Sequence, residues 1–329
     1  MNDLFLERMR EMLKDEYPAY LEKLNDPARK GLRINTLKIT PDDFFACTNY
    51  ELEKSPFAKN GYYANIKSGV GFTPEHMAGF FYIQEPSASS AVTILDPKPG
   101  MKVLDMCAAP GSKSTQISEM LEQEGLLVAN EIHPTRSRIL LENIERCGSA
   151  NTIVLNNDPK DISKAFPEFF DMVLCDAPCS GEGMFRKEDQ AVEQWSLENV
   201  QACALRQSYI LEEAYKCLKP GGTMVYSTCT FAIEENELCM QKFIQEHPDM
   251  HLVPIEVDFG RKAFDLGCHT DYARRIFPMD GGEGHFIAKL QKDVTSTEST
   301  VKLMQSQALP KEAKEFFDEF FVNQYPYYF

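Results

Sequence analysis

The sequence predicts an α/β protein with a parallel sheet covered by helices, preceded by a smaller α+β segment. From about residue 99, apolar strand-like segments alternate with helical segments, a rhythm typical of parallel sheets. Two later strands also run into short turn-forming segments built around a cysteine, residues 176–181 and 226–230. Residues just past the carboxyl ends of strands line the ligand crevice of an open α/β sheet, so we expect these two thiols at one site.

The elements of the α/β part follow one another in regular order. Strands are expected at residues 103–106, 126–129, 152–155, 172–176 and 223–226, near Leu252 and at 285–290. Helices are expected at residues 112–121, 134–148, 205–218 and 234–245. Pro134 suits a first helical turn and Gly148 suits a helix end, which supports the second helix.

The N-terminal residues have another pattern. Apolar residues at near-helical spacing predict a helix over residues 2–25, with Pro18 as a point of interruption or restart. Further elements expected here are a half-buried strand at 32–37, a helix starting near Pro41, and short strands and turns at Tyr62, Tyr63 and 69–72. We therefore divide the chain into residues 1–75, residues 76–292, and a polar linker with an aromatic-rich extension at 293–329.

Composition narrows the class of protein. Apolar residues make up 43 % of the 329 residues and charged residues 26 %, as in ordinary globular proteins. Ten cysteines without a C-x-x-C pair disfavour a zinc site, and we expect no metal. The sequence begins without a signal peptide and contains no apolar run of membrane-spanning length. We therefore expect a cytoplasmic protein that does not bind membranes, and a monomer.

The charge is unevenly distributed. The net charge of −16 argues against nucleic acid, because phosphate contacts need lysine and arginine. Residues 1–75, however, hold 11 basic against 12 acidic residues, whereas residues 76–230 hold 13 against 21. The basic positions Arg29, Lys30, Arg33 and Lys38 lie in this least acidic segment. It is where nucleic acid contacts are expected, the alternative being an ordinary solvated charge cluster.

Residues 105–114 join the first strand of the α/β part to a helix and predict a cofactor loop. The small residues Ala108, Ala109, Pro110, Gly111 and Ser112 let the backbone approach a ligand, and a helix N-terminus offers free N–H groups. No G-x-G-x-x-G or P-loop pattern is present, which disfavours a nicotinamide dinucleotide or a P-loop nucleotide site.

Two acidic residues extend this cofactor site. Glu131, after the second strand, is placed to accept hydrogen bonds from ribose hydroxyls, and Asp158, after the third strand, to reach a base amino group. Together with the small-residue loop they indicate a nucleoside cofactor. For Glu131 taken alone, a helix-capping acid is the alternative.

Three motifs together resemble one family. Residues 105–113 (DMCAAPGSK), 176–181 (DAPCSG) and 227–230 (STCT) resemble the cofactor, catalytic and nucleophile motifs of the Sun/Nop family of RNA cytosine-5 methyltransferases. Residues 181–187 (GEGMFRK) and 281–286 (GGEGHF) are most similar to its bacterial RsmF-type branch, which modifies small-subunit ribosomal RNA. The resemblance covers roughly residues 30–290. It implies a Rossmann-like methyltransferase domain after an RNA-binding N-terminal segment.

The resemblance also implies residue roles. Cys229 resembles the nucleophile, Cys179 the cysteine that helps release the product, Asp176 the acid that contacts the cytosine ring, and Lys113 the active-site lysine. The implied cofactor is S-adenosylmethionine, held by residues 108–113 with Glu131, Arg136, Asp158 and Asp176. The implied substrate is 16S ribosomal RNA, free or in the 30S subunit. Relatives carry a further C-terminal RNA-binding domain, so we expect that the chain is truncated after residue 329.

The implied chemistry explains why two thiols are needed. A Cys229 thiolate that adds to C6 of cytosine makes C5 nucleophilic enough to take a methyl group, an instance of covalent catalysis. An acid near N3 favours the addition, and the base must be flipped out or single-stranded.

Other functions remain open from the sequence. A cytosine-5 DNA methyltransferase would use Cys179 as nucleophile and leave Cys229 without a role. A non-catalytic ribosome-assembly protein would need neither cysteine. For either thiol, burial in the core is the structural alternative, which the flanking Pro, Ser, Gly and Thr residues disfavour.

Overall fold

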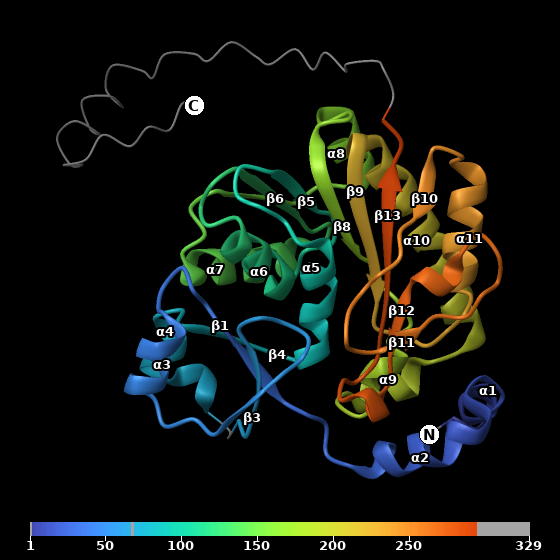
Figure 1. Cartoon of the computed structure of the whole chain (residues 1–329), viewed down its shortest axis with the longest axis horizontal. Coiled ribbons are helices and arrows are strands. Elements are labelled where there is room, and N and C mark those ends of the chain that lie inside the picture. The colour runs from blue at the N-terminus through green and yellow to red at the C-terminus, as the bar shows by residue number, and fades with distance from the viewer. Residues whose placement is uncertain (1, 67–68, 295–329) are drawn as a thin grey trace. The chain divides into compact units, whose positions relative to one another are not determined.

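A computed structural model describes residues 2–66 and 69–294, and these form two β-sheets with their covering helices (Figure 1). The larger sheet has a parallel part made of β5 (Lys102–Asp105), β6 (Leu126–Asn130), β7 (Thr152–Leu155), β8 (Phe170–Asp176) and β9 (Leu218–Thr228). Its antiparallel part is made of β13 (His285–Lys292), β12 (Arg274–Ile276), β11 (Arg261–Lys262) and β10 (Met250–Leu252). The order is β11-β12-β13-β9-β8-β5-β6-β7, with β10 beside β13.

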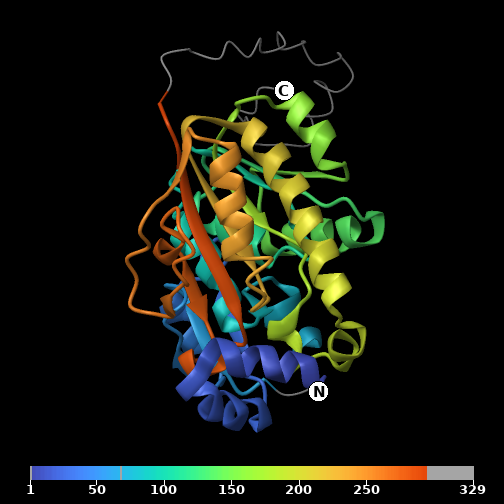
Figure 2. The same cartoon turned by 90° about the vertical axis from the view of Figure 1, so that its right-hand side faces the viewer.

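Helices cover both faces of this sheet, which confirms the layered α/β prediction. The helices are α5 (Ser90–Leu95), α6 (Ser112–Met120), α7 (Pro134–Cys147), α8 (Pro159–Ala165), α9 (Asp189–Gln194), α10 (Leu197–Cys217) and α11 (Glu237–Glu246). Figure 2 shows α10 in yellow and α11 in orange on one face. The sequence does not predict the short helices α5, α8 and α9. Helix α10 begins earlier than expected, because Ser196 caps its N-terminus by accepting the Asn199 N–H with its hydroxyl oxygen.

Alternate strand residues build the two core layers. Leu104, Val173 and Met224 pack with α8, α10 and α11, whereas Val103 and Val225, their neighbours in the chain, pack with α5 and α6. Successive strand side chains point to opposite faces, so apolar residues at nearly every position are what a sheet buried on both sides requires. This explains the continuous apolar runs in the sequence.

The N-terminal sheet has the order β2-β3-β1-β4 and is antiparallel throughout. Its elements are β1 (Gly31–Ile34), α3 (Pro41–Cys47), β2 (Leu52–Lys54), β3 (Gly61–Ala64), α4 (Pro74–Met77) and β4 (Phe81–Gln84). Because β4 pairs with β1, the sheet extends past residue 75. Of the short strands and turns expected at Tyr62, Tyr63 and 69–72, the tyrosines lie in strand β3 and residues Val70–Phe72 form a 3₁₀ turn.

The first helical segment is split in two. Helices α1 (Asp3–Leu13) and α2 (Tyr17–Asn25) are separated by a 3₁₀ turn, and Pro18 lies in the first turn of α2, as its fixed φ favours. The ring of Phe5 lies 4.8 Å from that of Phe185, centroid to centroid. These helices therefore pack on the α/β part of the chain, through a cluster that also includes Trp195.

Strand β1 is buried at all four positions, so the expectation of a half-buried strand is wrong. The reason is Arg33, which is only 1 % exposed and forms an ion pair with Glu119 of α6. Its guanidinium also donates to the Thr115 hydroxyl (2.8 Å) and the Ser112 carbonyl (3.2 Å). Arg33 joins the N-terminal sheet to the cofactor-loop helix, and it is unavailable for nucleic acid phosphates.

The buried Arg33 ion pair gives a stability prediction. Arg33→Met should lower the free energy of unfolding by about 3–5 kcal/mol, because it leaves the Glu119 carboxylate buried without its partner. The measurement is urea unfolding followed by circular dichroism. Lys38→Met, at an exposed position in the same segment, should change it by less than about 0.5 kcal/mol. Equal stability of the two variants would contradict this account of β1.

Candidate active site

The site lies at the point where the strand order of the sheet reverses. Strand β5 pairs with β6 on one side and with β8 on the other, so strands that follow β5 in the chain are added on both sides of it. Such a switch point is where ligands bind in open α/β sheets. Asp105 and Asp176 are the last residues of β5 and β8, and Cys229 directly follows β9. Parallel pairing therefore brings these three side chains to one edge.

The two motif cysteines lie together. The sulfur atoms of Cys179 and Cys229 are 3.2 Å apart, and the Cys229 backbone N–H donates to the Cys179 sulfur at 3.3 Å. The hydrogen bond with Cys229 and burial raise the pKa of Cys179 well above its ordinary value. Two thiols this close do not ionise together. The pair can therefore carry only one negative charge at a time.

Lys113 and Asp176 form an ion pair beside the thiols. The Lys113 Nζ lies 2.6 Å from Asp176 Oδ2, and the Ser227 hydroxyl donates to Asp176 Oδ1 at 2.7 Å. Burial lowers the pKa of the Lys113 ammonium, but the carboxylates of Asp176 and Asp105 outweigh this, so the pKa is raised overall. The lysine is therefore charged at neutral pH and fixes Asp176 at the site.

Asp105 contributes a second carboxyl group in a dry setting. Burial raises its pKa to about 7, against the hydrogen bond that the Ser114 hydroxyl donates to Oδ2 at 2.6 Å. Its Oδ1 has no hydrogen-bond partner among the described residues. A buried acceptor without a partner is uncommon and indicates a place where a ligand donor fits.

The cofactor loop is held from three sides. The Ala108 N–H donates to the Asn130 carbonyl (2.8 Å), Arg136 donates to the Ala109 carbonyl (2.8 Å), and the Tyr82 hydroxyl donates to the Pro110 carbonyl (3.3 Å). Gly111, at φ +112°, adopts a conformation that a side chain disfavours, and Ser112 begins α6 directly after it. The loop geometry is thus fixed by contacts within the protein.

The two predicted acids at the strand ends have structural partners. Glu131 is buried, accepts the His133 N–H at 2.9 Å and lies 3.5 Å from the Arg136 guanidinium. Asp158 caps α8 by accepting the Lys160 N–H at 2.9 Å and also accepts from the Tyr209 hydroxyl. Both lie past the carboxyl ends of their strands, so they share the edge of the sheet with the thiols.

Glu235, which sequence analysis missed, supports the cysteine loop. Its carboxylate accepts the Ser180 N–H at 3.0 Å and the Gln207 amide at 2.7 Å, and burial raises its pKa to about 7. The residue lies in an acidic run that looks like a solvated helix start, so only the tertiary structure reveals its role. It fixes the backbone next to Cys179.

His285 is a second residue that the sequence did not single out. It opens β13, and its Nδ1 lies 3.0 Å from the Ser87 hydroxyl and 3.6 Å from Glu85. Burial lowers its pKa to about 4, so the ring is neutral at pH 7. The motif at residues 281–286 indicates the branch of the family but gives this histidine no role of its own, because its contact with residues 85–87 joins distant parts of the chain.

The described residues also bear on membranes and metals. None of the helices in residues 2–66 and 69–294 has the length and apolar character that crossing a bilayer requires. Within the same ranges, histidine, cysteine, aspartate and glutamate side chains form no group of three or more suited to a metal ion.

Comparison with known proteins defines the class. The model of the 16S rRNA methyltransferase RsmB/F family matches residues 92–291, and that of the RsmF N-terminal domain matches residues 1–86. The chain therefore belongs to the RsmB/F family of methyltransferases. A solved methyltransferase homologue from Pyrococcus horikoshii superposes with a TM-score of 0.77 at 31 % identity, covering 89 % of this chain and 95 % of that one.

Individual relatives place the chain near one member of the family. Ribosomal RNA small subunit methyltransferase F of Vibrio cholerae (strain M66-2) is 39 % identical over 302 residues, and that of Escherichia coli (strain HS) is 37 % identical over 303. Each alignment covers 88 % of this chain and 63 % of the relative. The chain thus spans less than two thirds of the length of these proteins.

The raised pKa of Glu235 gives a prediction on stability and pH. Its folded pKa of about 7 exceeds the ordinary 4.5, so the stabilising protonated form is present below pH 4.5 and is lost as the pH rises through 7. We compare the free energy of unfolding of the wild type with that of Glu235→Gln at each pH. The wild-type value minus the variant value should fall by up to about 3 kcal/mol between pH 4.5 and pH 7. Urea unfolding at pH 4.5 and 8 measures it.

The control for this prediction is Glu246→Gln, which changes an exposed carboxyl at the end of α11. It should follow the wild-type pH dependence. If Glu235→Gln follows it as well, Glu235 is not the group that titrates.

Proposed function

We propose that this chain transfers a methyl group from S-adenosylmethionine to C5 of cytosine in 16S ribosomal RNA. The observation that carries the proposal is the pair of sulfur atoms 3.2 Å apart at the ends of adjacent parallel strands, beside the Lys113–Asp176 ion pair. Membership of the RsmB/F family and the two small-subunit rRNA methyltransferases described above support it. The proposed setting is the cytoplasm, with a monomer acting on free rRNA or on the assembled subunit.

Cys229 is the proposed nucleophile. Two thiols this close do not ionise together, and Cys229 resembles the nucleophile of the family, so Cys229 is proposed to supply the thiolate. The thiolate adds to C6, and C5 takes the methyl group of S-adenosylmethionine, which leaves S-adenosylhomocysteine. C5 then gives its proton to a base, and elimination restores both the C5–C6 double bond and the Cys229 thiolate. Cys179, whose sulfur lies 3.2 Å away, assists this elimination step. Asp176, oriented by Lys113 and Ser227, contacts the pyrimidine ring at N3.

The residues at the sheet edge fit the proposed cofactor. S-adenosylmethionine supplies an electrophilic methyl group together with ribose hydroxyls and a base amino group. The buried Glu131 carboxylate is placed for hydroxyl donors, and residues 108–113 present small side chains and a helix start. The unpartnered Asp105 Oδ1 offers a further acceptor, while Arg136 and Asp158 border the site.

Residues 1–75 are proposed to hold RNA, with residues 76–292 as the methyltransferase domain. Arg33 is withdrawn from the RNA contacts because it is buried against Glu119. Arg29, Lys30 and Lys38 remain exposed, so phosphates can reach them. The expected extension at 293–329 lies outside the described residues, apart from its first two positions.

Substitution of each cysteine should block a different step of the reaction. Cys229→Ala removes the attacking thiolate, so neither a covalent RNA complex nor product should form. Cys179→Ala leaves the attack intact and impairs elimination, so the protein should accumulate bonded to RNA. Incubation with S-adenosylmethionine and labelled, unmodified 16S rRNA, followed by a denaturing gel, shows which variant carries a protease-sensitive adduct.

Cys268→Ala, a change to a half-buried cysteine outside the site, is the matched control and should behave as the wild type. The reverse pattern, with the adduct only in Cys229→Ala, would make Cys179 the nucleophile, as in cytosine-5 DNA methyltransferases. No adduct and no methyl transfer with any cysteine variant or the wild type would favour a non-catalytic RNA-binding protein.

Cofactor binding tests Glu131 separately from catalysis. Glu131→Ala should weaken S-adenosylmethionine binding by about 1–3 kcal/mol, because a buried hydrogen-bond acceptor is lost. Isothermal titration calorimetry measures it, with Glu124→Ala, at an exposed position before β6, as a control of unchanged affinity. An unchanged affinity for Glu131→Ala would remove this residue from the site.

A further inference from the structure

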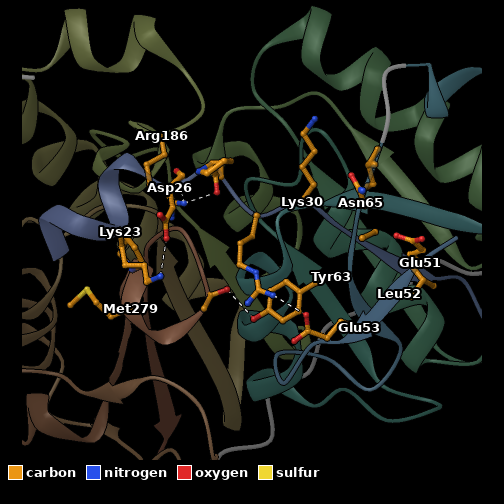
Figure 3. Close-up of a pocket in the computed structure, with 17 residues that line it drawn as sticks. Lys23, Asp26, Lys30, Glu51, Leu52, Glu53, Tyr63, Asn65, Arg186 and Met279 are labelled. Atoms are coloured by element: carbon orange, nitrogen blue, oxygen red, sulfur yellow. Dashed lines mark hydrogen bonds and ion pairs between the residues drawn. The ribbon is translucent and has the colours of Figure 1, made fainter. Parts of the chain in front are cut away.

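A groove outside the thiol site lies between the end of α2, the β2–β3 hairpin and a turn at residues 278–281 (Figure 3). Its volume is about 1040 Å³. Figure 3 shows Lys23 and Arg186 on one side of it, with Lys30 and Tyr63 on the other. We call this cavity the hairpin groove.

One buried carboxylate fixes both walls of the hairpin groove. Glu283 is 1 % exposed; its Oε1 accepts the Arg29 backbone N–H at 2.8 Å, and its Oε2 lies 3.3 Å from the Arg186 guanidinium. Arg186 also donates to the carbonyls of Asp26 (3.0 Å) and Pro27 (2.8 Å). The groove is therefore a built feature of the fold, whose shape does not depend on a ligand.

The lining offers cations and flat surfaces. The Arg29 guanidinium lies 3.5 Å from the centre of the Tyr63 ring, which is anchored because its hydroxyl donates to the Gly281 carbonyl at 2.9 Å. Among the described residues, the Arg29 guanidinium forms an ion pair with Glu53 alone, whose side chain is 73 % exposed. Lys30 has no carboxylate within ion-pair distance in the described part of the chain. Exposed pairs of this kind are weak, so these cations are available to a stronger anion.

A short stretch of chain connects the hairpin groove to the proposed nucleophile. The Gly183 N–H donates to the Cys229 carbonyl at 2.9 Å, and Arg186, which lines the groove, follows Gly183 by three residues, a span of at most about 11 Å. RNA held in the groove can therefore reach the proposed nucleophile within a few nucleotides.

We propose that the hairpin groove binds the single-stranded RNA next to the target cytosine, with a phosphate at Lys30 and a base on the outer face of the Arg29 guanidinium, whose inner face lies on the buried Tyr63 ring. The inference rests on the proposed function and extends it to the flanking nucleotides. A chain with net charge −16 needs a local set of cations to hold RNA, and lysine and arginine contacts supply that affinity by releasing counterions. Unstacked bases are recognised on aromatic rings and guanidinium planes.

Paired charge changes with opposite expected signs test the groove. Lys30→Glu should raise the Kd for a fluorescein-labelled single-stranded segment of 16S rRNA about 3- to 10-fold and make the salt dependence of binding shallower by about 0.7. Glu53→Gln should lower the Kd, because it releases Arg29. Lys98→Glu, a change of the same kind at an exposed site outside the groove, should leave the Kd unchanged. Fluorescence anisotropy at several salt concentrations measures all three.

Equal Kd values and salt slopes for Lys30→Glu and Lys98→Glu would overturn the groove proposal. In methyl transfer to 16S rRNA, Lys30→Glu should raise KM and Glu53→Gln should lower it, and neither variant should change kcat. The binding assay needs no methyl transfer, so a wild-type chain that binds RNA through the groove but transfers no methyl group contradicts the proposed function and supports the groove. A chain that transfers methyl groups with unaltered Kd in all variants contradicts the groove alone.

Discussion

The charge of the buried Lys113 ammonium is the constraint on which the rest of the site depends. Without it, the edge of the sheet would gather Asp105, Asp176 and two thiols in a place with little water, where each negative charge is costly. The Lys113 ammonium lies 2.6 Å from the Asp176 carboxyl group, whereas burial raises the pKa of Asp105 to about 7. The two carboxyl groups at these neighbouring strand ends therefore have different partners, an ammonium for Asp176 and the Ser114 hydroxyl for Asp105.

The residues that hold the two cysteine loops in place lie on other elements than the cysteines themselves. Glu235 fixes the backbone after Cys179, and Glu237 forms a buried ion pair with Arg275, which in turn donates to the Phe231 carbonyl at 2.9 Å. These bonds restrain the segments that follow β8 and β9. A separation of 3.2 Å between two sulfur atoms is a consequence of this framework, because neither cysteine loop is a regular element.

The N-terminal segment is tied to the catalytic part at two places. Helices α1 and α2 pack on Phe185 and Trp195, while Arg33 of β1 pairs with Glu119 of α6. A surface for RNA on this segment is therefore held in fixed relation to Cys229, which the hairpin groove requires. The division of the chain at residue 75 follows a change in pattern, yet strand pairing continues to β4.

The sequence by itself determined the layered α/β architecture, the five parallel strands and the convergence of both cysteine motifs, because apolar periodicity and turn residues are local signals. It also identified Lys113 and Asp176, although only through resemblance. The tertiary structure alone decided that Arg33 is buried, that Asp158 caps α8, and that Glu235 and His285 support the site. The burial of Arg33 and the contacts of Glu235 and His285 depend on partners far along the chain. The role of Asp158 depends on a helix too short to leave a periodic pattern in the sequence. Local sequence patterns therefore cannot show which of these side chains are buried or paired.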